Sequence, residues 1–192
     1  LAPVDLSFCT QHSGLSGALN QPLNTMLHYP EIIEQLECWH RGVTPDWRWL
    51  IGYGPGLTPS GDDMLTGMLA VLYAAGLSAK LRYFLPPTEQ LVPLTTSVSC
   101  SYLNSARVGE FSTPLQKVIR GLQSGRDPHS AIRRLLAVGH SSGADILLGI
   151  AIAQRWLQVV DSRGTHARSG NNTHFYSGCT DGEFFPRGQL PA

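Results

Sequence analysis

Hydrophobic residues along the chain recur at helical spacing, and no segment alternates in the way a β-strand does. The clearest case lies between Ser112 and Gly125, where apolar residues follow the i, i+3, i+4, i+7 pattern from Leu115 onwards. Similar patterns, bounded by Pro, Gly or Ser, predict five more helices, and 46–51 has room for a further turn or two. The helices are expected at 30–41, 60–75, 93–108, 113–124, 128–138 and 142–160. We therefore expect an all-α fold, a bundle of about six helices.

Two of these segments, starting near Ser60 and Ser142, are apolar on nearly every face. A helix that is hydrophobic all round belongs in the core of a globular protein. They are accordingly predicted as the two buried core helices. The longest apolar run, 146–153, is much shorter than the roughly 20 residues of a membrane span.

Composition divides the chain into three parts. Residues 1–29 show no periodicity and are expected to form an irregular N-terminal segment. Residues 30–161 carry the helical signals and are predicted as one helical domain. Residues 162–192 are rich in Gly, Asn and Thr without a period, which is typical of a disordered tail.

A short phrase occurs at the start of both core helices. Residues 60–67 and 142–149 share the pattern Ser-Gly-x-Asp-x-Leu-x-Gly, and each copy follows a stretch rich in Gly, Ser, Thr or Pro. One interpretation is structural: Ser-x-x-Asp fits a capping box, and the last glycine would permit close helix packing. On that interpretation the repeat is a duplicated helix start that binds nothing.

The other interpretation is a binding site for a small anion. Helix N-termini present unpaired N–H groups and partial positive charge, and glycines let backbone donors approach a ligand closely. Two such N-termini in one place would make one site. Its predicted anion-binding residues are Gly54, Gly56, Thr58, Ser60, Gly61, Ser141, Ser142 and Gly143. The phrase lacks the Gly-Lys-Ser/Thr of a Walker A loop, and no βαβ unit frames it as in a dinucleotide fold.

Three residues are candidates for catalysis. Asp63 and Asp145 occupy the same place in the two copies, and His140 lies in the loop before the second copy, where it would donate to an oxyanion or shuttle a proton. The alternative for His140 is a histidine that closes the preceding helix. No cofactor is firmly indicated, although Asp62 and Asp63 together would suit Mg²⁺ beside a phosphate.

A run of hydroxyl residues places Thr96 and Ser99 on one helix face together with Cys100. Such a stripe either lines a polar pocket or packs tightly against neighbouring helices. Both interpretations stay open at the level of sequence.

Charge and cysteine content exclude several classes. Lys+Arg and Asp+Glu are 14 each, so the net charge of zero favours neither nucleic acid nor an anionic membrane as partner. The four cysteines show no Cys-x-x-Cys spacing, which argues against a zinc knuckle. No secretory signal opens the chain, and a cytoplasmic protein with reduced thiols is expected.

The phrases at 52–63 and 139–145, with the intervening Thr-x-x-Ser run and Ala106-x-x-Gly109, resemble the AllH family. The resemblance spans about 50–155, so this chain looks like the C-terminal helical part of a longer family protein. The family includes a subunit of bacterial oxamate carbamoyltransferase.

The resemblance implies an enzyme subunit, a carbamoyltransferase of anaerobic allantoin and purine nitrogen catabolism in the cytoplasm. The reaction would convert oxalurate and phosphate to oxamate and carbamoyl phosphate, in a hetero-oligomer with FdrA-like and AllG-like subunits. The resemblance assigns no catalytic residue. The alternative function is a non-catalytic helical scaffold or a regulatory subunit that binds an anion.

Overall fold

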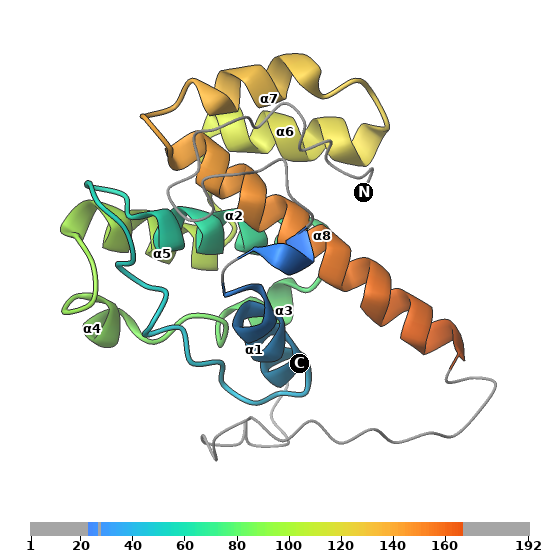
Figure 1. Cartoon of the computed structure of the whole chain (residues 1–192), viewed down its shortest axis with the longest axis horizontal. Coiled ribbons are helices and arrows are strands. Elements are labelled where there is room, and N and C mark those ends of the chain that lie inside the picture. The colour runs from blue at the N-terminus through green and yellow to red at the C-terminus, as the bar shows by residue number, and fades with distance from the viewer. Residues whose placement is uncertain (1–22, 27, 167–192) are drawn as a thin grey trace, which may run out of the picture.

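The computed structural model describes residues 23–26 and 28–166, and Figure 1 shows that they fold into helices joined by turns. No strand occurs among these residues, which confirms the predicted all-α class. They contain a short 3-10 helix and eight α-helices. In chain order these are η2 (Leu23–Thr25), α1 (Tyr29–His40), α2 (Ser60–Ala74), α3 (Ser78–Leu81), α4 (Thr88–Leu91), α5 (Ser97–Arg107), α6 (Thr113–Ser124), α7 (His129–Leu136) and α8 (Ser142–His166).

The helix count exceeds the expected six because α3 and α4 are single turns of four residues. Helices this short carry no periodic signal. The helix expected from 93 begins at Ser97 instead, since the Thr96 hydroxyl accepts a hydrogen bond from the Ser99 N–H at 3.0 Å and caps it there. The segment 46–51 forms turns without a helix.

The last core helix is longer than expected. α8 runs past 160 to His166, so residues 162–166 belong to a helix and were wrongly assigned to the tail. At the other end, η2 and the start of α1 fall within the segment expected to be irregular. Residues 1–22 and 167–192, which make up most of the two expected irregular ends, lie outside the described residues.

The core is built around α2 and α8, which pack against each other more extensively than any other pair of helices in the described chain. Their close approach depends on the final glycine of each repeat. A Cβ atom at Gly67 would lie 2.0 Å from the carbonyl oxygen of Ile146, and one at Gly149 would lie 2.0 Å from that of Met64. The last residue of each eight-residue copy thus faces the fifth residue of the other copy. The two helices therefore pack as a nearly symmetric pair.

The remaining helices surround this pair (Figure 1). α6 and α7 pack against each other, α5 contacts α2, and α7 contacts α8. The far end of α8 contacts α1, where the Trp156 indole N–H donates to the Glu37 carboxylate at 3.1 Å and Arg163 forms an ion pair with the same carboxylate.

One described helix segment, Ser142–Gly164, has the length and composition of a membrane span, but 72% of its most apolar stretch is buried in the fold, as expected for a core helix. Among the described cysteines, Cys100 is a free and buried thiol whereas Cys38 is disulfide-bonded. The expectation of reduced thiols therefore holds for Cys100 and is wrong for Cys38.

Candidate functional site

The N-termini of α2 and α8 lie side by side, and a pair of hydroxyl groups joins them. Thr58, two residues before α2, shares a 2.8 Å hydrogen bond with Ser142, the first residue of α8. The two copies of the repeat are thereby united at one place in the molecule, although 84 residues separate these two side chains in the sequence.

This junction encloses the two aspartates that the repeat has in common. The Asp63 side chain is 7% exposed and Asp145 is fully buried. Burial raises the pKa of Asp63 to about 7; the Ser142 hydroxyl opposes that rise by hydrogen bonding, and the negative charge of Asp145 adds to it. A carboxyl group that titrates near neutral pH is suited to giving and taking a proton.

Two polar atoms at the junction have no hydrogen-bond partner among the described residues. They are Oδ2 of Asp63 and Oγ of Ser60, which is 1% exposed. A buried polar atom without a partner costs about 1–3 kcal/mol. A buried polar atom without a partner lowers the stability of the fold, so its presence needs an explanation. Binding of a ligand to that atom is one such explanation.

The first copy of the repeat does not form a capping box at the start of α2. Pro59 occupies the N-cap position of α2, and no side chain caps the helix. The Asp62 and Asp63 N–H groups donate instead to the Pro59 carbonyl, at 3.0 and 3.1 Å. The structural interpretation of Ser60 and Asp63 as capping partners is therefore wrong.

Gly61 and Gly143 serve packing rather than ligand approach. A Cβ atom at either position would lie 1.9 Å from a backbone carbonyl oxygen, that of Leu50 for Gly61 and that of Leu135 for Gly143. Their N–H groups are also in use, because Gly61 donates to Tyr53 and Gly143 donates to Val138. These two donors are thus directed at the protein.

The loop before α2 contains the glycines that remain available to a ligand. Gly54 and Gly56 are both exposed and have φ angles of 110° and 94°, a region that residues with side chains rarely adopt. Gly54 packs over Ser60, since a Cβ atom at Gly54 would lie 3.0 Å from the Ser60 hydroxyl oxygen. Around Gly56 there is open space within 4 Å.

Asp62 plays a different part from its neighbour Asp63. Its carboxylate accepts hydrogen bonds from the Gly52 N–H at 2.9 Å, from the Ser99 hydroxyl at 2.6 Å and from the Thr95 hydroxyl. Asp62 therefore fastens the start of α2 to α5, and its oxygens are not directed at a metal ion shared with Asp63. Within the described range, no group of three or more His, Cys, Asp or Glu side chains is arranged to hold a metal.

The hydroxyl stripe of α5 is explained by the same contacts. Ser99 is bonded to Asp62, while the Thr96 hydroxyl caps α5 and donates to the Leu57 carbonyl. This arrangement agrees with the packing interpretation of Thr96 and Ser99. The stripe ties the glycine-rich loop to α5.

His140 and Ser141 lie in the turn that leads into α8. His140 is exposed and Ser141 is half-buried. Because Ser142 contacts Thr58, this turn borders the junction from the side of α8. His140 is placed at the rim rather than among the buried carboxylates.

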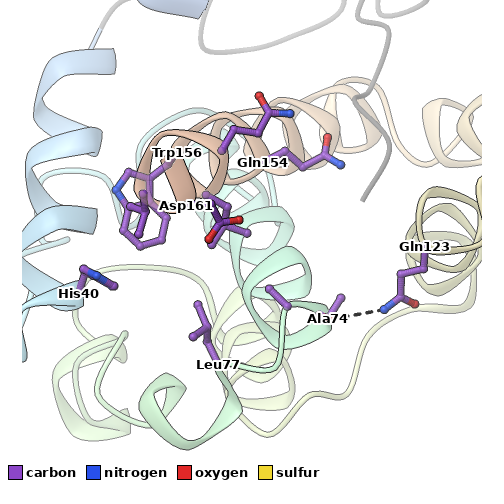
Figure 2. Close-up of a pocket in the computed structure, with 11 residues that line it drawn as sticks. His40, Ala74, Leu77, Gln123, Gln154, Trp156 and Asp161 are labelled. Carbon is purple, nitrogen blue, oxygen red and sulfur yellow. Dashed lines mark hydrogen bonds between the residues drawn. The ribbon is translucent and has the colours of Figure 1, made fainter. Parts of the chain in front are cut away.

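A cavity of about 630 Å³ lies away from this junction (Figure 2). It is lined by residues such as His40, Ala74, Gln154 and Trp156 and sits at the C-terminal end of α2. The 15 residues of α2 separate it from Ser60 by about 20 Å of helix. It contains none of the residues that the repeat indicates, so the cavity and the junction are separate features.

The sequence did not reveal the Thr58–Ser142 contact or the attachment of Asp62 to α5. The signal for the second was present, since a buried carboxylate needs donors and Thr95 and Ser99 stand near the start of a predicted helix. The two carboxylates that the repeat singled out, Asp63 and Asp145, are brought together.

Fold and site define an all-α protein whose two core helices begin at a shared buried carboxylate pair. The family model described as oxamate carbamoyltransferase subunit AllH matches residues 50–154, and the chain belongs to this family. Membership of a subunit family implies a hetero-oligomeric enzyme complex. No solved structure matches this chain.

Proposed function

We propose that the junction of α2 and α8 is the substrate site of a carbamoyltransferase subunit. In the proposed reaction, oxalurate and phosphate give oxamate and carbamoyl phosphate, within anaerobic allantoin and purine nitrogen catabolism in the cytoplasm. FdrA-like and AllG-like subunits are the proposed partners. The observation that carries the proposal is the buried Asp63–Asp145 pair at two joined helix N-termini, with Asp63 titrating near pH 7.

The chemistry requires one proton transfer. A phosphate oxygen forms a bond to the carbamoyl carbon of oxalurate, the bond from that carbon to the nitrogen of the oxamate unit breaks, and this nitrogen takes up a proton. Protonated Asp63 is the proposed donor, and its carboxylate accepts the proton in the reverse direction. Because Asp145 lies beside it, the pair shares one proton more readily than it carries two charges.

The loops supply neutral donors for the developing negative charge on the carbamoyl oxygen. Fixed N–H and O–H groups lower the barrier of acyl transfer by stabilising this charge. The proposed donors are the backbone around Gly54 and Gly56 and the hydroxyls of Thr58, Ser60 and Ser142. His140 and Ser141 border the same opening.

The alternative is a scaffold or regulatory subunit that binds an anion without turnover. One observation favours it. The segments 49–79 and 135–154, which form both helix starts, contain no Lys or Arg to neutralise a substrate anion. The reaction would then take place on a partner subunit.

Phosphate protection of the reconstituted complex tests the proposed site. A ligand that binds only the folded state raises the melting temperature. We expect millimolar phosphate to raise it in the wild-type complex and Gly56→Ala to abolish most of that rise, because a side chain at φ 94° displaces the loop.

Gly76→Ala is the matched control. Gly76 also has a positive φ, 81°, and open space around it, but it follows the C-terminal end of α2. Backbone strain should be similar in both variants, and the phosphate effect should survive only in Gly76→Ala. An equal loss in both, or no phosphate effect in the wild-type complex, would rule out the loop as an anion site.

A further inference from the structure

Positive charge is concentrated in the helical hairpin that α6 and α7 form. The segment 111–144 contains a single acidic residue, Asp127, although the whole chain has 14 Asp and Glu residues. The same segment contains five basic residues, and all of them are exposed: Lys117, Arg120, Arg126, Arg133 and Arg134. Because the net charge of the whole chain is zero, this hairpin is a positive region that attracts anions.

A groove between the two helices gathers most of these basic side chains. α6 and α7 pack side by side (Figure 1), and residues of both helices and of the turn that joins them line a groove of about 390 Å³. Gly121, Pro128 and Ala131 are half-buried and form its floor, where a Cβ atom at Gly121 would lie 3.3 Å from the Cβ atom of Pro128. The basic residues that line the groove are Lys117, Arg120, Arg126 and Arg134.

These four positive charges are not neutralised by neighbouring carboxylates. None of the four side chains forms an ion pair with a carboxylate of residues 23–26 or 28–166. Asp127 also lines the groove, but its carboxylate accepts a hydrogen bond from the His129 N–H at 2.9 Å and lies 3.4 Å from Nε2 of His129. Like charges gathered in one place repel each other, and a bound anion would relieve that repulsion.

The groove resembles a site for a small molecule more than a protein interface. Its volume of about 390 Å³ lies within the range of about 300–1,000 Å³ that is usual for small-molecule sites. Protein interfaces centre on exposed apolar or aromatic residues. In the described stretch 109–137, no large hydrophobic side chain is exposed.

The chemistry of the lining favours phosphate groups as ligands. Three of the four cations are arginines, and the planar guanidinium group presents pairs of N–H donors that fit the oxygens of a phosphate group. With four cations and one carboxylate, the groove has a net charge of about +3. A compound with two or three linked phosphate groups carries opposite charge of comparable size.

We propose that the groove between α6 and α7 binds a polyphosphate compound, either a nucleoside di- or triphosphate or an inorganic polyphosphate. Arg126 and Arg134 contact the phosphate oxygens from the turn and from α7, and Lys117 and Arg120 do so from α6. The groove shares no lining residue with the junction of α2 and α8, so it is a second ligand site. The inference does not depend on the proposed function.

Calorimetric titration of the full chain with inorganic triphosphate tests the site. In about 50 mM NaCl, where screening is modest, we expect saturable binding at one site. Arg126→Gln and Arg134→Gln should each weaken it by about 10-fold or more, because each variant loses charge-assisted hydrogen bonds to phosphate. Both variants should keep the wild-type melting temperature, since the two side chains are exposed.

Arg133→Gln is the matched control. Arg133 is adjacent to Arg134 and equally exposed, but it does not line the groove, so this variant should bind triphosphate as the wild type does. Equal weakening in Arg133→Gln and Arg134→Gln would show that the hairpin attracts anions by its overall charge. That result, or no binding by the wild type, would overturn the inference.

Titrations with ATP and AMP identify the kind of phosphate compound. Tighter binding of ATP than of triphosphate would identify a nucleotide as the ligand, whereas equal or weaker binding of ATP would identify the phosphate chain itself. AMP has a single phosphate group and should bind about 10-fold more weakly or less, because it pairs with fewer of the cations. Equal binding of AMP and ATP would contradict recognition of linked phosphates.

Two further titrations with triphosphate locate the ligand. Gly56→Ala alters the loop before α2 and should leave this binding unchanged, so its loss would place the ligand at the junction and overturn the inference. The reconstituted complex should bind triphosphate as the full chain does. Binding that disappears on assembly would identify the groove as a partner surface and also overturn it. None of these outcomes depends on turnover, so failure of this inference would leave the proposed function standing.

Discussion

Asp62 and Asp63 are adjacent in the sequence, yet the structure gives their carboxylates opposite surroundings. Asp62 accepts three hydrogen bonds from Gly52, Thr95 and Ser99, whereas one oxygen of Asp63 has no partner among the described residues. A buried carboxylate with several donors stabilises the fold. A buried carboxylate with a like charge beside it does the reverse.

Asp62→Asn should therefore destabilise the protein. The amide nitrogen cannot accept from the Thr95 and Ser99 hydroxyls, and the loss of hydrogen bonds to a charged group costs about 2 kcal/mol. Urea unfolding measures this change. Asp46→Asn removes a carboxylate that contacts the exposed Arg48, so it should cost less than about 1 kcal/mol. Equal effects of the two variants would contradict the structural role of Asp62.

Asp63 should make the stability of the protein depend on pH. Its pKa rises from the usual 3.8 to about 7 on folding, chiefly because of burial, so between these values the folded state binds more protons than the unfolded state. The free energy of unfolding should consequently fall as pH rises from about 4 to about 7, by at most about 4 kcal/mol, and change little above. Urea unfolding at a series of pH values should show this decline in the wild type and a weaker one in Asp63→Asn. An identical decline in both would mean that another group is responsible.

At the scale of elements, the fold depends on the glycine contact between α2 and α8. Gly67→Ala would place a methyl group 2.0 Å from the Ile146 carbonyl oxygen, and Gly149→Ala would do the same at Met64. Neither backbone can yield without separating the core helices. Each variant should lose more than about 3 kcal/mol of unfolding free energy or fail to fold.

Gly164→Ala is the matched control for this prediction. Gly164 also lies in α8, but a Cβ atom there would meet nothing within 4 Å. Alanine should raise stability by up to about 1 kcal/mol, because it favours the helix over the unfolded chain. Thermal unfolding of the three variants decides the question, and similar melting temperatures would contradict the close packing.

Helical periodicity and the repeat predicted the class of fold and the starts of both core helices. Both features can be recognised from residues that are close together in the sequence: the spacing of apolar residues, and a Ser-Gly pair that follows a Pro- or Gly-rich loop. The continuation of α8 beyond residue 160 was not predictable, because Gly164 and the polar residues around it do not indicate a helix. Its stability comes in part from contacts with distant residues, such as that of Arg163 with Glu37.

The site was less predictable than the fold, for a similar reason. Sequence alone placed Asp63 and Asp145 at equivalent positions but left a helix cap and a binding site as alternatives. The structure excludes the cap at α2, because Pro59 occupies the N-cap position, and it joins the two helix starts through Thr58 and Ser142. Both features are properties of tertiary structure. Gly61 and Gly143 were expected to approach a ligand because sequence does not show which backbone atom faces a glycine.

At the scale of the whole molecule, the chain combines a well-packed core with a buried pair of carboxyl groups where two helices begin. The chain belongs to a family of enzyme subunits, so it is expected to work in an assembly. The core fixes the relative position of two carboxyl groups. Stability is given up at that point, since a raised pKa at Asp63 means that its charged form is unfavourable in the folded state.

Turnover of the Asp63→Asn complex, measured beside its stability, tests the central claim most directly. The assay is carbamoyl phosphate formation from oxalurate and phosphate at pH 8 by the reconstituted subunits, with Asp145→Asn alongside and the exposed Asp161→Asn as control. We predict that both buried variants lose at least about 100-fold in turnover. Asp63→Asn should be no less stable than the wild type, because a buried charge is removed. Asp161→Asn should behave as the wild type in both measurements. Near-normal turnover in both Asp63→Asn and Asp145→Asn would contradict the account and place the reaction on another subunit.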